Sequence, residues 1–201
     1  MTKTLEFIFD FASPNAYLVH KVLPGLIERT GAKLVYTPCL LGGIFKSTNN
    51  QAPMVANANI PKKAAYDMLE FRRFIARHGL NEFKMNPHFP VNTVALMRGA
   101  VAAEELGELP QYIEAGLHHM WEDPKPMGDP AIVAEAMTSS SLDGNKLMEM
   151  TQEQRIKDRL FENTNHAVER GAFGIPTYFI GEDMYFGKER LGQVEEALTN
   201  S

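Results

Sequence analysis

Hydrophobic and polar positions at the start of the chain follow a strand–helix–strand pattern. Residues 5–10 form a short run rich in Phe and Ile, which is typical of a strand buried on both faces. Apolar residues then recur at helical spacing from 15 to about 29, where Pro24 and Gly25 are expected to bend or interrupt the helix. A second strand is predicted at 33–37, and it should pair in parallel with the first.

The middle of the chain shows no strand pattern. Residues 41–61 are dense in Gly, Asn, Ser and Pro without periodicity, so we expect a long loop there. From 62 to about 170, amphipathic segments separated by Pro and Gly predict a series of helices. One of these helices has a clear start, because Asp129 can cap its first turn and Pro130 suits the first helical position.

Strand patterns return near the end of the chain. Two short β-rich runs, 177–180 and 184–186, flank a turn and predict a hairpin. Residues 188–198 predict a closing amphipathic helix, with Leu191 and Val194 on its buried face.

This order of elements indicates the fold class. A βαβ unit, a block of helices and a ββα unit follow one another in an α/β thioredoxin-like fold with a large all-helical insertion between the second and third strands. Residues 1–61 and 171–201 would form the thioredoxin-like domain, and residues 62–170 the helical insertion domain.

Composition and charge exclude several classes of protein. The 201 residues are 44% hydrophobic and 22% charged, as in an ordinary globular protein rather than a disordered chain. The formal net charge of -5 argues against nucleic acid as a partner, because phosphate backbones are bound by clustered positive charge. Cys39, the one cysteine, cannot close an intramolecular disulfide, which fits the reducing cytosol. With neither a cleavable leader nor an apolar stretch near 20 residues, we expect a cytoplasmic protein without a membrane partner.

Ser13 is the first candidate for chemistry, because it lies between the first strand and the first helix in the sequence FDFASPNAY. One role is structural, since a serine before a proline is a common helix cap. The other is chemical: free N–H groups at a helix N-terminus favour an anion, and the hydroxyl can donate to a bound thiolate. Such a bond contributes about 1.5–3 kcal/mol, or roughly one to two pKa units of thiol acidification. The two roles can coexist.

The residues around Ser13 exclude two other chemistries. Redox enzymes of this fold carry Cys-x-x-Cys at the strand-to-helix corner, but here positions 13–16 read Ser-Pro-Asn-Ala, which excludes dithiol exchange by the protein itself. No Gly-x-Ser-x-Gly elbow surrounds the serine, which excludes it as a hydrolase nucleophile. Sulfur chemistry at this corner would need a sulfur supplied by a ligand.

Two later segments are candidates for binding. Gly174-Ile175-Pro176 precedes the hairpin, where this fold places a cis-proline loop; the alternative is a simple turn in which Gly174 has a positive φ. A cis bond would leave the backbone of Ile175 free to pair with an extended peptide-like ligand. Lys188-Glu189 opens the last helix, where Glu189 either complements the helix dipole or holds the ammonium of a zwitterionic amino-acid end while free N–H groups hold its carboxylate.

Five segments, taken together and in order over nearly the whole chain, resemble the 2-hydroxychromene-2-carboxylate isomerase family. They are FDFASPNAY, LGGIFKSTNNQAP, FPVNT, RGAFGIPTYFI and YFGKERLGQVEEAL. This family is related to kappa-class glutathione transferases and, more distantly, to disulfide oxidoreductases of the thioredoxin superfamily. The resemblance implies a glutathione-dependent enzyme.

The resemblance also implies site residues. Ser13 matches the catalytic serine that hydrogen-bonds the glutathione sulfur. The other positions that match glutathione contacts are Pro14, Asn15, Asn50 and the cis-proline pair Ile175 and Pro176. Lys188 and Glu189 fall where kappa-class transferases carry Ser-Asp at the γ-glutamyl end, so here the acid is one methylene longer and a lysine replaces a small hydroxyl.

The mechanism implied by the family is reversible conjugate addition to an aromatic-derived, α,β-unsaturated carboxylate. Addition of the thiolate turns a double bond into a rotatable single bond, and elimination after rotation returns the thiol, so glutathione is a cofactor. Two alternatives stay open: a kappa-class-like transferase that consumes glutathione on small electrophiles, and a glutathione-binding protein without turnover. Relatives in this superfamily are commonly dimers, so a homodimer also stays open.

Four neighbouring residues have side chains of the kinds that ligate metals: His118, His119, Glu122 and Asp123. Adjacent residues on a helix point about 100° apart, unlike the i, i+4 histidine pair of a zinc helix. We therefore expect no metal site.

Overall fold

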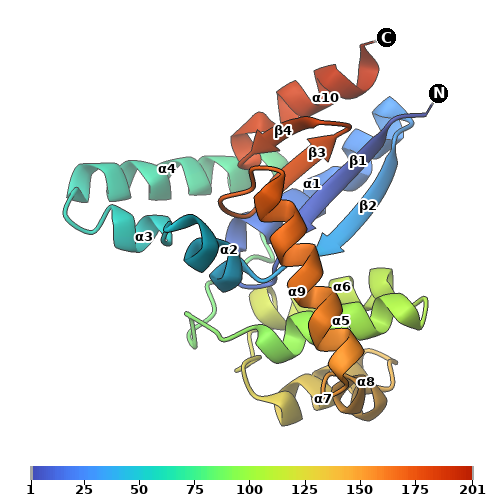
Figure 1. Cartoon of the computed structure of the whole chain (residues 1–201). Coiled ribbons are helices and arrows are strands. Elements are labelled where there is room, and N and C mark those ends of the chain that lie inside the picture. The colour runs from blue at the N-terminus through green and yellow to red at the C-terminus, as the bar shows by residue number, and fades with distance from the viewer. Residues whose placement is uncertain (1, 201) are drawn as a thin grey trace.

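A four-stranded mixed sheet organises the protein, as seen in a computed structural model that describes residues 2–200 (Figure 1). The strand order is β2-β1-β3-β4. β2 (Lys33–Pro38) runs parallel to β1 (Thr4–Phe9), whereas β3 (Thr177–Ile180) and β4 (Asp183–Phe186) form an antiparallel hairpin beside β1. The parallel pair, the hairpin and the helices inserted between them confirm the predicted α/β thioredoxin-like fold.

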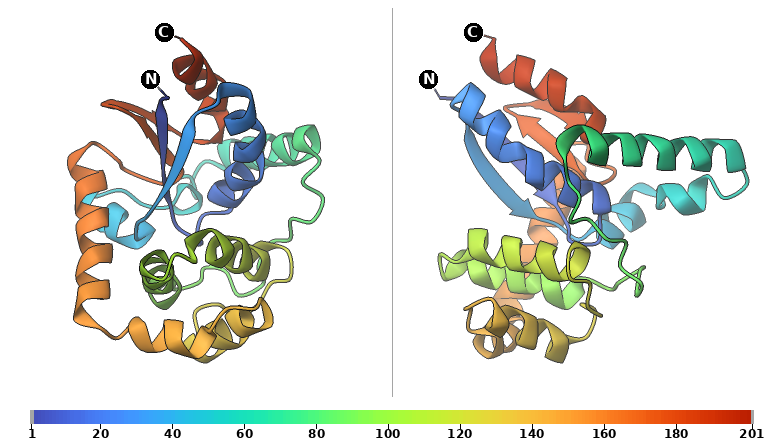
Figure 2. Two further views of the ribbon diagram at one scale, coloured as in Figure 1. Left: turned by 90° about the vertical axis from the view of Figure 1, so that its right-hand side faces the viewer. Right: turned by 180° about the vertical axis from the view of Figure 1, so that it is seen from behind.

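Helices cover both faces of the sheet and form a separate layer below it. Figure 2 shows α1 and α10 on one face, α9 along the other, and α5 to α8 beyond the carboxyl ends of β1 and β2. The helices are α1 (Pro14–Thr30), α2 (Leu41–Thr48), α3 (Pro53–Ala56), α4 (Pro61–His78), α5 (Val94–Glu105), α6 (Leu109–Trp121), α7 (Pro130–Ser139), α8 (Gly144–Met150), α9 (Gln154–Glu169), the 3-10 helix η1 (Lys188–Arg190) and α10 (Leu191–Thr199).

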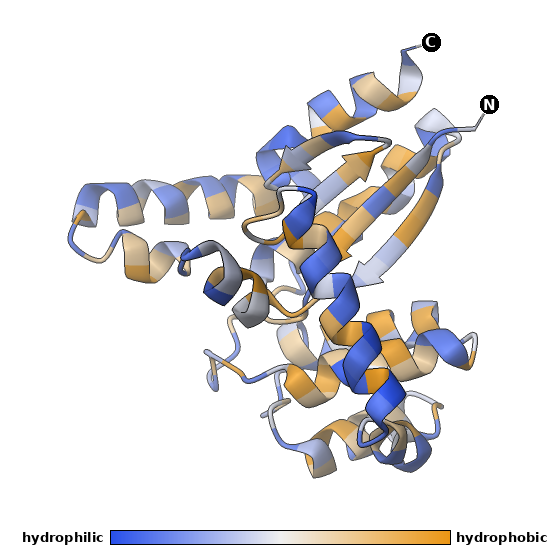
Figure 3. Ribbon diagram, viewed as in Figure 1, coloured by the Kyte–Doolittle hydropathy of each residue, from blue (hydrophilic) through white to orange (hydrophobic). Residues whose placement is uncertain are grey.

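The amphipathic patterns explain how these helices pack. In α9 the buried residues Ile156, Leu160, Thr164 and Ala167 recur every three or four positions, and the rest of the helix is mainly hydrophilic (Figure 3). The helix start predicted at Asp129 is confirmed, since its carboxylate accepts a hydrogen bond from the N–H of Ala131. Buried residues of the strands and of the helical layer belong to one hydrophobic core.

The predicted long loop at 41–61 is wrong, because the structure has α2 and α3 there. The start of α2 is held from outside the segment: Leu40 N donates to Thr164 Oγ1 at 3.0 Å, and Leu41 N donates to Asp10 Oδ2 at 2.8 Å. Partners far away in the sequence therefore stabilise a helix that local composition disfavours. Of the two outcomes predicted at Pro24, a bend or an interruption, the interruption is wrong, because α1 continues through this residue.

The paired helices α3 and α4 project to one side of the protein as an arm (Figures 1 and 2). Although α4 falls in the range predicted for the helical insertion domain, it lies level with the sheet and contacts α1. The division at residues 61 and 170 stays a prediction.

Among residues 2–200, no helix is both long and apolar enough to cross a membrane.

Charged side chains connect α1 to α6. His20 Nε2 and Glu114 Oε1 lie 2.6 Å apart, and Lys21 Nζ lies 3.2 Å from Glu114 Oε2 and 3.0 Å from Glu122. Chiefly because of its hydrogen bond with His20, and despite partial burial, the pKa of Glu114 is lowered to about 2. A carboxylate with a lowered pKa stabilises the folded state above its ordinary pKa and loses this effect as the pH falls toward the folded value.

Glu114→Gln should therefore destabilise the protein at pH 7, and the difference from wild type should shrink as the pH falls from 4.5 toward 2. The expected loss is less than about 1 kcal/mol, because Glu114 is half-exposed and solvent screens its ion pairs. Denaturant unfolding of both proteins at each pH measures it. The exposed residue Glu135 of α7 supplies the control, Glu135→Gln, which should show no such pH dependence. A loss at pH 7 that persists near pH 2 would contradict this assignment.

Candidate active site

Ser13 lies between β1 and α1, and it is only 4% exposed. Its extended backbone, with φ -93° and ψ 111°, makes it the N-cap of α1, where Oγ accepts a hydrogen bond from Ala16 N at 3.2 Å. Pro14 takes the first helical position, which needs no N–H. The capping role predicted for Ser13 is confirmed, and its hydroxyl lies at the positive end of a 17-residue helix.

The Ser13 hydroxyl also contacts the loop before the hairpin. Oγ donates a hydrogen bond to the carbonyl oxygen of Ile175 at 3.1 Å, so residues 162 positions apart in the sequence meet directly. The Ile175–Pro176 bond is cis, as predicted. The simple-turn alternative is wrong, because the positive φ occurs at Gly171 and not at Gly174. The sequence led us to expect a free backbone at Ile175. Instead, its carbonyl oxygen accepts the hydrogen bond from Ser13.

Two hydrogen bonds to backbone carbonyls connect the remaining predicted segments to this loop. Gly187 N donates to the carbonyl oxygen of Pro176 at 3.0 Å, which holds the start of η1 beside the cis-proline. Asn50, an exposed residue just after α2, donates from Nδ2 to the carbonyl oxygen of Phe173 at 2.8 Å. All predicted site segments therefore meet around one loop.

Lys188 and Glu189 form an ion pair with each other. The side chain of Lys188 is only 7% exposed, and its Nζ lies 5.9 Å from the centre of the Phe74 ring in α4. Burial alone would raise the pKa of Glu189, but its hydrogen bonds with Lys188 and the backbone and the nearby positive charges lower it below its ordinary value. These residues begin a 3-10 helix rather than the predicted α-helix. A zwitterionic ligand would have to exchange partners with this pair.

Asn15 provides a test of whether these residues fit glutathione. Its Oδ1 atom, in the first turn of α1, is buried and has no hydrogen-bond partner within residues 2–200. A buried acceptor without a donor is costly, so this atom suits a ligand that brings an N–H group. The helix N-terminus at Ser13 suits a thiolate. The residues present therefore fit a small peptide-like thiol.

Sequence reasoning missed three residues that support the Ser13 corner. Asp10 is fully buried and accepts three hydrogen bonds, one of them from Thr93 just before α5. Trp121, at the end of α6, donates from Nε1 to the carbonyl oxygen of Phe11 at 3.0 Å and so ties the helical layer to the corner. The one signal for Asp10 was a carboxylate directly after a buried strand; nothing in the sequence indicated its partners.

His118, His119 and Asp123 lie closer together than helical spacing predicts. Their ligand atoms lie within 4.8 Å of one another, because Asp123 follows the end of α6 and its N–H donates back to the carbonyl oxygen of His118. Other charged groups already engage two of them: His118 Nδ1 lies 2.9 Å from Glu122, and Lys125 Nζ lies 3.9 Å from Asp123. The absence of a metal site stays a prediction.

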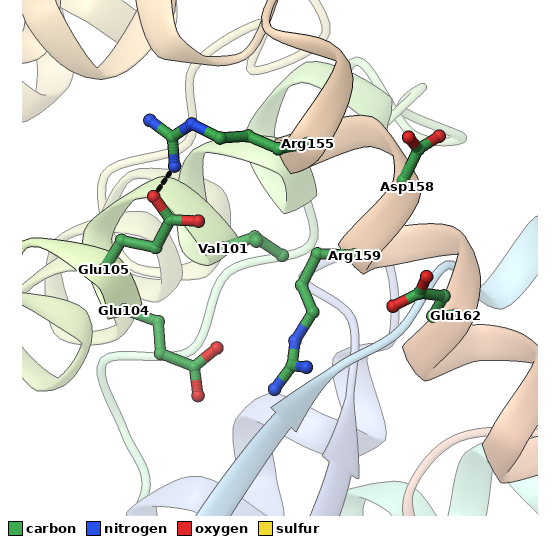
Figure 4. A pocket seen from close by; sticks show the side chains of 7 residues that line it. All are labelled: Val101, Glu104, Glu105, Arg155, Asp158, Arg159 and Glu162. Atoms are coloured by element: carbon green, nitrogen blue, oxygen red, sulfur yellow. Dashed lines mark ion pairs between the residues drawn. The ribbon is translucent and has the colours of Figure 1, made fainter.

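A charged hollow lies between α5 and α9, away from the predicted residues (Figure 4). An ion pair between Arg155 and Glu105 spans it, and the other side chains that line it are Val101, Glu104, Asp158, Arg159 and Glu162. None of these residues was predicted to bind a ligand.

Cys39 is buried and lies outside the Ser13 corner, and burial raises the pKa of its thiol. It is therefore a poor nucleophile.

Comparisons with known proteins agree with this architecture. Residues 4–199 match the family described as the DsbA-like thioredoxin domain. A solved structure of a 2-hydroxychromene-2-carboxylate isomerase superimposes with a TM-score of 0.80 at 23% identity, covering 97% of this chain and 94% of that one. That match concerns the fold.

Two curated relatives extend the comparison over the full length of the chain. The 2-hydroxychromene-2-carboxylate isomerase of Sphingobium xenophagum is 27% identical, over 98% of this chain and 99% of the relative. Glutathione S-transferase kappa 1 of Rattus norvegicus is 28% identical, over 94% of this chain and 88% of the relative. The chain therefore belongs to the DsbA-like thioredoxin domain family, and its relatives there include isomerases and kappa-class glutathione transferases.

Proposed function

We propose that the protein is a glutathione-dependent isomerase of the 2-hydroxychromene-2-carboxylate type, acting in the breakdown of aromatic compounds. The observation that carries the proposal is the position of the Ser13 hydroxyl, which lies at the N-terminus of α1 and bonds to the carbonyl of the residue before a cis-proline. This arrangement combines an anion site for a sulfur with a backbone segment suited to an extended peptide. The isomerase relative of 27% identity, matched over nearly its whole length, supports the same activity.

When bound, glutathione would supply the thiolate that adds reversibly to the conjugated substrate. The residues of the chain bind and orient it. The Ser13 hydroxyl would turn away from the Ile175 carbonyl and donate its hydrogen bond to the sulfur, keeping its proton, while the positive end of the α1 dipole stabilises the negative charge. The carbonyl released at Ile175 can then accept an N–H of the peptide. Lys188 and Glu189 would hold the carboxylate and ammonium of the γ-glutamyl end.

Two exposed aromatic rings border the proposed site and suit an aromatic-derived substrate. The ring centres of Phe173 and Phe186 lie 4.4 Å apart, and both rings are partly exposed. Phe173 belongs to the loop that carries Ile175, and its carbonyl accepts from Asn50. Apolar rings beside a polar anchor are typical of a site for a flat organic acid.

A kappa-class-like transferase is the second candidate, because a kappa-class relative is as similar in sequence as the isomerases are. The two activities differ in the fate of glutathione, since a transferase consumes one molecule in each turnover.

We further propose a cytoplasmic location, because the one buried thiol of Cys39 requires no oxidising compartment.

The proposal is tested by following 2-hydroxychromene-2-carboxylate with and without glutathione. We expect conversion only when glutathione is present. Conversion at the same rate without glutathione would contradict the proposed role of the thiol. Binding of glutathione without any conversion would favour the transferase or a binding protein, and loss of thiol on a model electrophile separates these two.

A further inference from the structure

Asp10 is a buried carboxylate that accepts hydrogen bonds from two backbone N–H groups and one hydroxyl group. Oδ1 accepts from Ala12 N at 2.9 Å and from Thr93 Oγ1 at 2.8 Å, and Oδ2 accepts from Leu41 N at 2.8 Å. The side chain is 0% exposed, and within residues 2–200 no ion pair compensates it. A buried carboxylate held in this way is costly unless its hydrogen bonds are all satisfied.

The three donors belong to three separate segments of the chain. Ala12 directly precedes Ser13, Leu41 begins α2, whose far end leads to Asn50, and Thr93 directly precedes α5 of the helical layer. The backbone carbonyl of Asp10 also accepts from the N–H of Ser13 at 3.1 Å. The side chain of Asp10 therefore fixes where the Ser13 corner, α2 and the helical layer lie relative to one another.

We propose that Asp10 is a positioning residue that orients Ser13 and the N-terminus of α1 toward the sulfur they bind. The effect of Asp10 on catalysis rests on the proposed function. Its effect on the orientation of Ser13 and α1 does not require glutathione. The buried thiol of Cys39, just after β2, interacts with the charge of Asp10. Burial raises the pKa of Asp10 and outweighs the three hydrogen bonds that lower it.

Two roles of Asp10 predict opposite results for a thiol placed at the corner. If Asp10 acted mainly as a negative charge, its removal would lower the pKa of that thiol, because like charge disfavours a thiolate. If it positions the helix N-terminus, its removal would raise the pKa, because the thiolate loses well-aligned N–H donors. The sign of the shift separates the two roles.

Ser13→Cys provides a reporter thiol at the corner without any ligand. Its pKa is measured from the pH dependence of alkylation; Cys39 is buried and does not interfere. Adding Asp10→Asn, which keeps the shape but turns one acceptor into a donor, should raise the reporter pKa by about one unit. Adding Thr93→Val, a milder change that removes one donor, should raise it by a smaller amount and covers the case in which Asp10→Asn does not fold.

Thr164→Val is the matched control. Thr164 holds the start of α2 from the other side, through Leu40 N, and belongs to α9 rather than to the Ser13 corner. This variant should lower the melting temperature but leave the reporter pKa unchanged. In the enzyme with Ser13 intact, Asp10→Asn should reduce glutathione-dependent kcat/KM about 10-fold, and Thr164→Val by less than about twofold.

A fall or no change in the reporter pKa on Asp10→Asn, or an equal rise with Thr164→Val, would overturn the positioning role. Because the reporter needs no glutathione, these outcomes are separate from a failure of the proposed function. That failure would appear instead as absence of glutathione-dependent conversion by the wild type.

Discussion

Ser13→Ala is expected to reduce glutathione-dependent kcat/KM by about 10- to 100-fold, equivalent to about 1.4–2.7 kcal/mol of transition-state stabilisation. The reason is the loss of the hydroxyl at the N-terminus of α1, which bonds to the Ile175 carbonyl and would stabilise the thiolate. The loss should be greatest below the pKa of the free thiol and shrink at alkaline pH, where glutathione ionises without help. Initial rates measured across pH test this.

The same substitution also removes a helix cap, so a control must separate stability from chemistry. Asp129→Ala is matched to it, because Asp129 caps α7 and is likewise followed by proline. Each variant should lose about 1 kcal/mol of unfolding free energy. Only Ser13→Ala should lose activity. An unchanged rate for Ser13→Ala across the pH range would remove this residue from the mechanism.

Gly116→Ala is expected to destabilise the protein by about 1–3 kcal/mol, although alanine is the better helix former. A Cβ at Gly116, in α6, would lie 2.5 Å from the ring of Phe11. That ring is fully buried, and the rings of Phe9 and Tyr112 pack against it with centres 5.4 and 6.0 Å away, so it cannot retreat. Because Phe11 lies between Asp10 and Ser13 in the sequence, a shift of its ring would displace the backbone of the Ser13 corner.

Gly192→Ala in α10 is the control for this helical glycine. Within residues 2–200, apart from its chain neighbours and the nearby backbone of its own helix, no atom lies within 4 Å of its added Cβ. It should be neutral or stabilising by up to about 1 kcal/mol. Thermal unfolding of the two variants gives the comparison. Equal stability of Gly116→Ala and Gly192→Ala would show that the close packing of α6 against Phe11 is not present in solution.

Local patterns in the sequence predicted much of this fold. The hairpin at 177–186 was predictable because two β-rich runs flank a turn. Ser13 was recognisable because a cap before proline at a strand end is a local signal. By contrast, α2 was missed because its first N–H groups are satisfied by Asp10 and Thr164, neither of which is nearby in the sequence.

The candidate site shows the same division. The sequence indicated each of its segments, but not that the Ser13 hydroxyl bonds to the Ile175 carbonyl or that Lys188 is buried against Phe74. The role of Asp10 was equally hidden, because the three segments it joins meet only in the folded protein. Such contacts depend on tertiary packing, which local composition does not encode.

The most direct test of the central claim follows the absorbance of 2-hydroxychromene-2-carboxylate with enzyme and substoichiometric glutathione, while free thiol is titrated in parallel. A glutathione-dependent isomerase should complete many turnovers for each glutathione molecule and lose no thiol. Conversion that stops when the glutathione is used up, with an equal loss of thiol, would contradict the isomerase and identify a transferase.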